Sequence, residues 1–377
     1  MKQNAVEILL MRGGTSKGVF MQGSDLPAAG RERDEMILRL LGEGDELQVD
    51  GLGGGNVSTS KLMAVWRSGS EGIDLEYLYA AVKPGGSRVD YGGNCGNLTA
   101  AVAMYGLLTN MISATGDMAE VSLLNLNTRK RIQAQQPLAR GLPASEGDFR
   151  VAGVKWDGAK ITTVHLDPGG AVLGAVLPTG RVVDEIAAGP GLPARVSIVD
   201  VTNPFVFVGA DHFGLDGTEL PGQLNTDSGL LEALEVLRGQ CAELLGLVEN
   251  GNDARTTTPG IPKLALVSKR RNHLANDGTL ISTDDHDLIV RTVAGGRIHH
   301  ACPVTGLMCT AAAGMLAGTV VHDLSGSFDG DRAVRIAHPK GIAEASAQVS
   351  IEGSEARVLS VSVSRTARPL ARGIAYI

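Results

Sequence analysis

A cysteine lies where a polar turn meets an alanine-rich segment, and its neighbours favour chemistry over packing. Asn94, Cys95, Gly96 and Asn97 lead into LTAAVAMYGLL, a segment typical of a helix. With Asn97 as a cap, free backbone N–H groups and the positive end of the helix dipole would point at the sulfur and favour its thiolate. Most free cysteines are small buried hydrophobes, but two asparagines and two glycines beside Cys95 favour a functional thiol.

Two glycine-rich and hydroxyl-rich turns suggest a site for small anions. The turn RGGTSKG spans residues 12–18, and the turn GGGNVSTS spans residues 53–60. Both turns expose backbone N–H groups and hydroxyls without bulky side chains, which suits a carboxylate or a phosphate. Ordinary hairpin loops are the competing interpretation. Lys17, Lys61 and Arg12 beside these turns favour the anion site.

Two cofactor patterns fail on their context. GLGGGN resembles a dinucleotide fingerprint, but its sixth position is Asn56 and a strand-like run follows, so no helix N-terminus is available for a pyrophosphate. His299, His300 and Cys302 could ligate a metal, yet adjacent strand residues point to opposite faces of a sheet. We therefore expect no nucleotide cofactor and no metal.

The composition is that of a globular, strand-rich protein. The chain has 377 residues, of which 43% are hydrophobic and 20% charged; glycine occurs 50 times, and aromatic residues make up 3%. Aliphatic cores with many tight turns between short elements are therefore expected, in two domains.

Charge and hydropathy exclude several classes of partner. The formal net charge is −7 with both signs mixed along the chain, so neither nucleic acid nor a membrane surface is an expected partner. The N-terminal apolar stretch is too short for a signal peptide, and no apolar run reaches the roughly 20 residues that span a membrane. The four cysteines lack paired CxxC spacing, so free thiols are expected. We expect a cytoplasmic protein with a small-molecule ligand, for which a homodimer is a compatible assembly.

The two halves of the chain repeat one order of elements. Residues 6–26 and 196–215 each predict a strand, a polar turn and a second strand, and a helix follows each pair. The next strand begins with Lys61 in the first half and with Lys263 in the second. The alanine-rich helices then place Cys95 and Gly96 opposite Thr305 and Gly306.

This duplication predicts the architecture. Few apolar residues occur around residues 180–193, so we expect an N-terminal lobe of residues 1–187 and a C-terminal lobe of residues 193–369, with residues 370–377 returning to the first lobe. The fold class is α+β. Each lobe is expected to be a curved sheet around its alanine-rich helix, with the site in the cleft between the lobes.

Five segments together resemble the family of 2-methylaconitate isomerases, which includes methylitaconate Δ-isomerases and oxalomesaconate isomerases. They are MRGGTSKG, GGGNVSTSK, VDYGGNCGN, HHACPVTG and SRTAR, in an order that covers nearly the whole chain. The wider superfamily is that of diaminopimelate epimerase and proline racemase. The resemblance implies a diaminopimelate epimerase-like fold, no cofactor, and proton transfer on small unsaturated di- or tricarboxylates.

The resemblance also implies roles for residues. The lysine of TSK is the expected base, which is Lys61 here. It would remove a proton from a carbon γ to a carboxyl group and leave a dienolate. For this its pKa must fall from about 10.4 toward ~7 or 8, through burial and nearby cations such as Lys17 or Arg12. Cys95 would reprotonate the other allylic carbon, or position the substrate if Lys61 moves the proton alone.

The remaining site residues are expected to bind the substrate carboxylates through backbone N–H groups, hydroxyls and cations. These candidates are Arg12, Gly13, Gly14, Thr15, Ser16, Lys17, Ser58, Ser60, Asn94, Gly96, Asn97, Thr305, Gly306 and Arg365.

Two alternatives stay open. In the racemases each half supplies one cysteine before its helix, whereas here Thr305 matches the second position and Cys302 and Cys309 are displaced. This disfavours a racemase or epimerase acting on an amino acid or hydroxyproline. A non-catalytic accessory protein for an aconitase-like dehydratase would need no titrating lysine. The sequence does not select the substrate, nor a cis–trans change over a double-bond shift.

Overall fold

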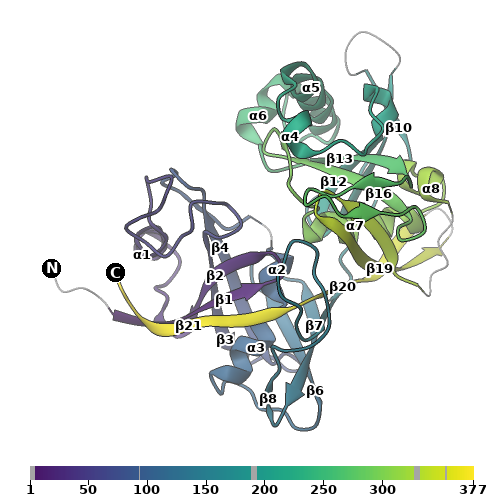
Figure 1. Cartoon of the computed structure of the whole chain (residues 1–377). Helices are drawn as coiled ribbons and strands as arrows, with labels where there is room; N and C mark the ends of the chain where they lie inside the picture. The colour runs from purple at the N-terminus through teal and green to yellow at the C-terminus, as the bar shows by residue number, and fades with distance from the viewer. Residues whose placement is uncertain (1–4, 93, 188–192, 327–331, 353–354) are drawn as a thin grey trace. The chain divides into compact units, whose positions relative to one another are not determined.

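The computed structural model describes residues 5–92, 94–187, 193–326, 332–352 and 355–377. The chain divides into two compact units, which are coloured by residue number in Figure 1. Unit 1 comprises Met1–Leu166 with Ser364–Ile377, and unit 2 comprises Asp167–Val363.

The unit boundaries differ from the expected lobe boundaries because of strand pairing. Strand β9 (Ile161–Leu166) pairs with β7 (Arg131–Ala139) and is the last strand before the chain enters unit 2. Strand β10 (Asp184–Ile186), expected in the first lobe, pairs with β11 (Ala194–Val201) inside unit 2. The return to unit 1 begins at Ser364 instead of residue 370. Residues 188–192 of the expected linker lie outside the described residues.

Unit 1 is a mixed sheet that alternates hairpins with parallel crossovers. Strands β1 and β2 are antiparallel, β2 and β3 parallel, β3 and β4 antiparallel, β4 and β6 parallel, and β6 and β7 antiparallel. Strand β21 returns antiparallel to β1. The strands are β1 (Ala5–Gly13), β2 (Ser16–Gln22), β3 (Lys61–Arg67), β4 (Leu75–Val82), β5 (Val89–Asp90), β6 (Met118–Asn125), β7, β8 (Leu142–Pro143), β9 and β21 (Ala367–Tyr376); the helices are η1 (Gly23–Asp25), α1 (Arg31–Leu41), α2 (Gly96–Thr99) and α3 (Val102–Leu108).

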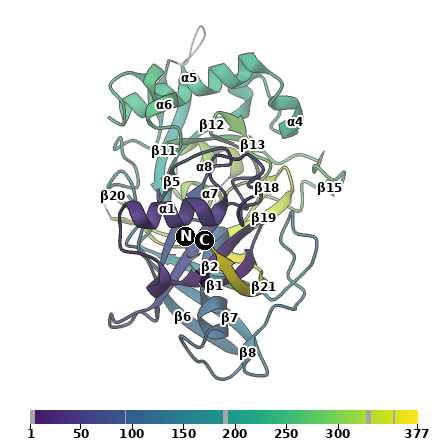
Figure 2. The same cartoon turned by 90° about the vertical axis from the view of Figure 1, so that its left-hand side faces the viewer.

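The two faces of this sheet bury different helices. Alternation in β7, where Ile132, Ala134, Gln136 and Leu138 are buried, sends every second side chain inward. The inner core holds α2 and α3 with side chains of β1, β3, β4, β6 and β7. Helix α1 packs on the opposite face, in front of the strands in Figure 2.

The alanine-rich segment of the first half forms two short helices instead of the single expected one. Helix α2 ends at Thr99 and α3 begins at Val102. Between them the Ala101 N–H donates to the Leu98 carbonyl, a tighter i→i+3 bond that interrupts the α-helical pattern. The prediction of helical structure over residues 98–108 is therefore confirmed in its location, but the prediction of one continuous helix is wrong.

Unit 2 repeats the pairing order of unit 1, which confirms the duplication. Strands β11 and β12 are antiparallel, β12 and β13 parallel, β13 and β16 antiparallel, β16 and β18 parallel, and β18 and β19 antiparallel. Helix α7 lies in the core of this unit and α5 packs against its other face. The strands are β10, β11, β12 (Asn203–Gly209), β13 (Lys263–Lys269), β14 (His273–Leu274), β15 (Leu280–Ile281), β16 (Leu288–Ala294), β17 (Arg297–Ile298), β18 (Val334–His338), β19 (Gly341–Glu352) and β20 (Glu355–Arg365), whose last two residues belong to unit 1; the helices are η2 (Ala210–Phe213), α4 (Pro221–Leu224), α5 (Ser228–Leu244), η3 (Gly251–Asp253), α6 (Ala254–Thr257), α7 (Val304–Met315) and α8 (Val320–Ser325).

None of the helices in the described part of the chain is long and apolar enough to cross a membrane.

Candidate functional site

Lys61 begins β3 and points into a buried polar environment at that end of the strand. Its Nζ donates a hydrogen bond to the Tyr79 hydroxyl at 3.1 Å and lies 5.2 Å from the centroid of the same ring. Tyr79 is on the neighbouring strand β4, opposite Met63. The Cys95 side chain lies near enough to the amine to raise the pKa of Lys61 through charge and hydrogen bonding. The structure therefore brings together the two predicted catalytic residues, Lys61 and Cys95.

The charge state of Lys61 differs from the expectation. Burial lowers the pKa of Lys61, but the Cys95 and Tyr79 side chains raise it through charge and hydrogen bonding, and the net shift is upward. The expected fall of this pKa toward neutrality is therefore wrong. The sequence showed cations near the lysine, whereas the groups that contact its Nζ are hydrogen-bond acceptors.

Cys95 occupies the residue that precedes α2 and is almost fully buried. Its Sγ lies 3.8 Å from the Ser16 hydroxyl, at the start of β2. Asn97 was expected to cap the helix, but α2 has no side-chain cap. The Asn97 side chain instead donates to the hydroxyls of Thr15 at 3.1 Å and Ser16 at 3.5 Å.

The turn between β1 and β2 approaches α2 closely because it carries two glycines. A Cβ at Gly13 would overlap the Asn97 carbonyl oxygen, and a Cβ at Gly14 would overlap the Asn97 side chain. Gly14 also has a positive φ of 49°, which disfavours any other residue. The glycines therefore serve close packing of this turn on the segment that carries Cys95.

The two predicted arginines support the same turn. Arg12 Nη1 donates to the carbonyls of Gly14 at 3.0 Å and Thr366 at 2.9 Å. Burial, and then the charge of Arg368, lower the pKa of the Arg12 guanidinium. Arg365 Nε donates to Asn97 Oδ1 at 3.3 Å. Both guanidinium groups lie in unit 1 with Lys61 and Cys95.

The second glycine-rich turn is joined to the first through the backbone. The Lys17 N–H donates to the Ser58 carbonyl at 3.0 Å. The Ser58 hydroxyl donates to Asn56 Oδ1 at 2.9 Å, and the Ser60 hydroxyl accepts from the Gln48 side chain at 2.6 Å. These two hydroxyls therefore make hydrogen bonds within their own loop.

Residues that the sequence analysis missed hold the Cys95 turn in place. Tyr77 donates to Asn94 Oδ1 at 3.1 Å, and Thr99 donates to the same oxygen at 2.9 Å and to the Cys95 carbonyl at 3.1 Å. The available signal was LEYLYAAV: Tyr77 and Tyr79 alternate on one face of a strand, in a chain with only five tyrosines.

The predicted contacts of the second half lie in unit 2. Thr305 and Gly306 are buried in the first turn of α7, and Gly306 leaves room for the Cys302 sulfur and the Phe205 ring. Lys263 begins β13, as Lys61 begins β3, and its Nζ lies 5.7 Å from the Phe205 ring centroid.

Strand register corrects one correspondence between the halves. Asp90 pairs with a residue of β4, and Arg297 pairs with a residue of β16. These two partner residues occupy equivalent positions in their strands, as the pairing of β4 with β3 and of β16 with β13 shows. Cys95 follows Asp90 at the same sequence distance as Cys302 follows Arg297, so Cys302, not Thr305, is the register equivalent of Cys95. The match to Thr305 is therefore three residues too far along the chain; a start of α7 one residue later relative to its strand, at Val304 after Pro303, accounts for only one of these three.

The described residues hold no group of three or more His, Cys, Asp or Glu side chains arranged for a metal ion. His299 has its Nδ1 at hydrogen-bonding distance, 2.8 Å, from the Ala301 carbonyl; burial is the main cause that lowers its pKa.

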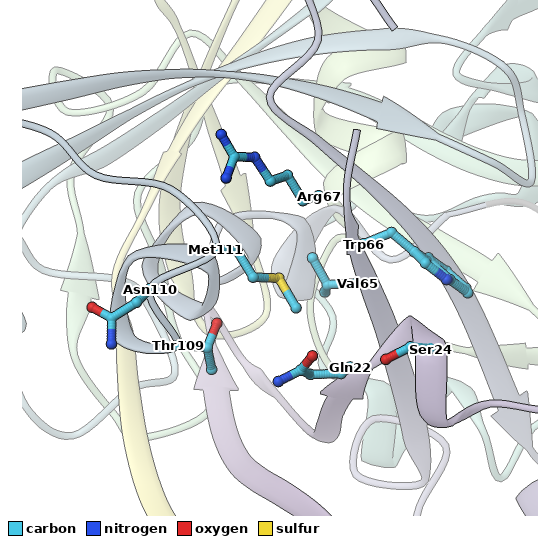
Figure 3. Close-up of a pocket in the computed structure, with 8 residues that line it drawn as sticks. All are labelled: Gln22, Ser24, Val65, Trp66, Arg67, Thr109, Asn110 and Met111. Atoms are coloured by element: carbon cyan, nitrogen blue, oxygen red, sulfur yellow. The ribbon is translucent and has the colours of Figure 1, made fainter. Parts of the chain in front are cut away.

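A separate pocket of about 330 Å³ lies at the other end of β3. Figure 3 shows the Met111 side chain extending toward Val65 in this pocket. None of the predicted site residues lines it. The lining residues are Gln22, Ser24, Val65, Trp66, Arg67, Thr109, Asn110 and Met111.

Comparison with known proteins identifies the family. Residues 3–377 match the model of the PrpF protein family, and the chain belongs to this family. It is 35% identical to the 3-methylitaconate isomerase of Eubacterium barkeri, over 100% of this chain and 98% of that protein. It is 33% identical to the 2-methyl-aconitate isomerase of Shewanella oneidensis and 33% identical to the 4-oxalomesaconate tautomerase of Pseudomonas putida, in both cases over 100% of this chain and 97% of the relative.

Solved structures confirm the expected fold. The chain is 34% identical in sequence to a crystal structure of methylitaconate-delta-isomerase, and the TM-score is 0.86. The match covers 100% of this chain and 96% of that chain. A hydroxyproline epimerase from Agrobacterium vitis has a TM-score of 0.61 at 12% identity, with 99% of this chain and 93% of that chain covered, and shows the shared fold alone. The fold is the diaminopimelate epimerase-like α+β fold, and the chain is an isomerase by family.

Proposed function

We propose that this isomerase moves a double bond, by an allylic proton shift, in a small unsaturated di- or tricarboxylate without a cofactor. The substrates we consider first are 2-methylaconitate, 3-methylitaconate and 4-oxalomesaconate, which correspond to the names of its relatives. The single observation that carries the proposal is the buried contact of Lys61 with Cys95 and Tyr79 in unit 1. An amine and a thiol in contact can take a proton from one carbon and return one to another.

The raised pKa of Lys61 suggests which member of the pair is the acid and which is the base in the forward reaction. Because its contacts favour the charged amine, Lys61 donates a proton at one end of the dienolate in this proposal, and Cys95, acting as the base, removes the allylic proton at the other end. The thiol then holds the abstracted proton and the amine is neutral. In the reverse direction neutral Lys61 is the base, the role expected from the sequence. Transfer of a proton from thiol to amine restores the resting pair.

The carboxylates are bound by the β1–β2 turn and the cations beside it in this proposal. Lys17, Arg12 and Arg365 supply positive charge around the turn that contains Gly13 and Gly14. The other proposed contacts in unit 1 are Thr15, Ser16, Ser58, Ser60, Asn94, Gly96 and Asn97; the roles of Thr305 and Gly306 in unit 2 stay predictions from the sequence. The cytoplasmic location and the homodimer stay predictions from the sequence.

The test is a panel of unsaturated di- and tricarboxylates incubated with purified protein and followed by ultraviolet absorbance. We expect one acid to be converted without any added cofactor, and Lys61→Met to lower kcat by at least about 100-fold. Lys83→Met is the matched control, because Lys83 is exposed at the end of β4. Equal activity of the wild type and Lys61→Met on the converted acid would exclude Lys61 from the chemistry.

A racemase or epimerase is the second candidate, favoured by the register equivalence of Cys302 and Cys95. Each half supplies one cysteine at this register position, which is the pattern that the resemblance to the racemases implies. Deuterium wash-in at the α-carbon of proline, hydroxyproline or another amino acid, with no conversion of the unsaturated acids, would select this candidate.

A further inference from the structure

Tyr79 contacts Lys61 from a strand that also supports Cys95. On β4, Tyr77 and Tyr79 lie two residues apart, so both side chains point to the same inner face. The Tyr79 hydroxyl accepts a hydrogen bond from Lys61 Nζ, whereas the Tyr77 hydroxyl bonds Asn94 and Thr99 beside Cys95. One strand therefore supplies one phenol to the amine and a second phenol to the residues that flank Cys95.

The backbone of Tyr79 is fixed by a side chain from the next segment. Strand β4 pairs in parallel with β6 only as far as Tyr77 and Asn125. Beyond that point the Asn127 side chain accepts from the Tyr79 N–H and donates to the Tyr79 carbonyl, both at 2.8 Å. Asn127 also donates to the Tyr91 carbonyl at 2.9 Å. The Asn127 side chain therefore takes the place of a strand partner for Tyr79 and fixes the backbone that carries the phenol.

The duplicated half keeps a hydroxyl at the same position. Tyr79 pairs with the residue two places after Lys61, and Thr292 pairs with the residue two places after Lys263. The Thr292 hydroxyl donates to the Cys302 sulfur at 3.5 Å, and Cys302 is the register equivalent of Cys95. The hydroxyl at this strand position therefore contacts the lysine in unit 1 and the cysteine in unit 2.

We propose that Tyr79 is the positioning residue of the proton-transfer pair: its hydroxyl oxygen binds the Lys61 ammonium and holds the amine beside Cys95. This inference rests on the proposed function. The phenol acts through Lys61, because a hydrogen-bond acceptor stabilises the charged amine and restricts its rotation. The other titratable groups near the contact are Cys95, which influences the pKa of both side chains, and Asp90, which influences the pKa of Tyr79.

The kinetic test is Tyr79→Phe, which removes the oxygen and keeps the ring. We expect kcat to fall by about 10- to 100-fold with KM nearly unchanged, because a misplaced amine affects the chemical step. We also expect the alkaline limb of the pH profile to move to lower pH, since loss of the acceptor lowers the pKa of Lys61. Tyr91→Phe is the matched control: its phenol bonds Asp34 at 2.5 Å, and its kinetics should match the wild type.

A second measurement does not depend on activity. Nuclear magnetic resonance of isotope-labelled lysine should show the Lys61 signal titrating at lower pH in Tyr79→Phe than in the wild type or Tyr91→Phe. An unchanged titration, or wild-type kcat and pH profile in Tyr79→Phe while Lys61→Met is inactive, overturns the Tyr79 inference alone. Wild-type activity in Lys61→Met overturns the proposed function instead.

Discussion

At the scale of single residues, the groups in contact with Lys61 determine the direction of its pKa shift more than the cations nearby do. Lys61 is buried, which alone would favour the neutral amine, yet a thiol and a phenol in contact with its Nζ favour the ammonium. The sequence pointed to Lys61 and Cys95 because both stand beside polar, glycine-rich turns. It could not show that Tyr79 is their neighbour, since that contact depends on the register of β3 against β4.

A residue-scale prediction concerns His165, a buried histidine on β9 that has no hydrogen-bond partner for its Nε2 among the described residues. Burial lowers the pKa of His165 from 6.5 to about 4. Its stabilising contribution is therefore complete above pH 6.5 and is lost as the pH falls through 6.5 toward 4. Between pH 7.5 and 4.5 this group should lower the free energy of unfolding by roughly 2 to 3 kcal/mol.

Urea unfolding at the two pH values measures this loss. His165→Leu should lose roughly 2 to 3 kcal/mol less stability on acidification than the wild type, since the leucine takes up no proton. Equal losses in the two proteins would show that His165 is not the neutral, buried group described here.

At the scale of elements, the order of strands and helices follows from patterns in the sequence. The exact pairing of residues between strands and the exact limits of the helices do not. The amphipathic segments near residues 31–42 and 227–246 become α1 and α5, and the apolar runs after Lys61 and Lys263 become β3 and β13. The break between α2 and α3 has no glycine or proline signal in AAVA. At the break the Ala101 N–H donates to the Leu98 carbonyl, a local i→i+3 bond for which the sequence carries no such signal.

The β1–β2 turn gives an element-scale prediction. Gly14→Ala should destabilise the protein by about 2–4 kcal/mol, from its positive φ and from overlap with Asn97. Gly141→Ala is the matched control, because Gly141 has a φ of +77° and open space around its Cβ position, so only about 1 kcal/mol is expected.

Chemical denaturation and kinetics together check the role of this turn. Gly14→Ala should also lose activity under conditions in which it is folded, because the turn holds the Asn97 segment beside Cys95. Equal stability losses in the two variants, with full activity in Gly14→Ala, would contradict the close packing of this turn on α2.

At the scale of the whole molecule, the duplication could be predicted and its detailed correspondence could not. Both halves repeat the same pairing order, as the repeated segments indicated. The alignment nevertheless matched Thr305 to Cys95, because small residues before an alanine-rich helix resemble one another when register is unknown. The unit boundary was also displaced, since a poorly apolar segment at residues 180–193 does not reveal which strand β10 joins.

The central claim is that Lys61 and Cys95 together move protons on an unsaturated carboxylate. The most direct test is a single turnover of the converted acid in D₂O, with enzyme in excess and the product analysed by nuclear magnetic resonance. We predict a deuterium at the newly protonated carbon, because Lys61 donates a solvent-derived deuteron while Cys95 keeps the abstracted proton. A product without deuterium, or the same conversion by Lys61→Met, would contradict the account.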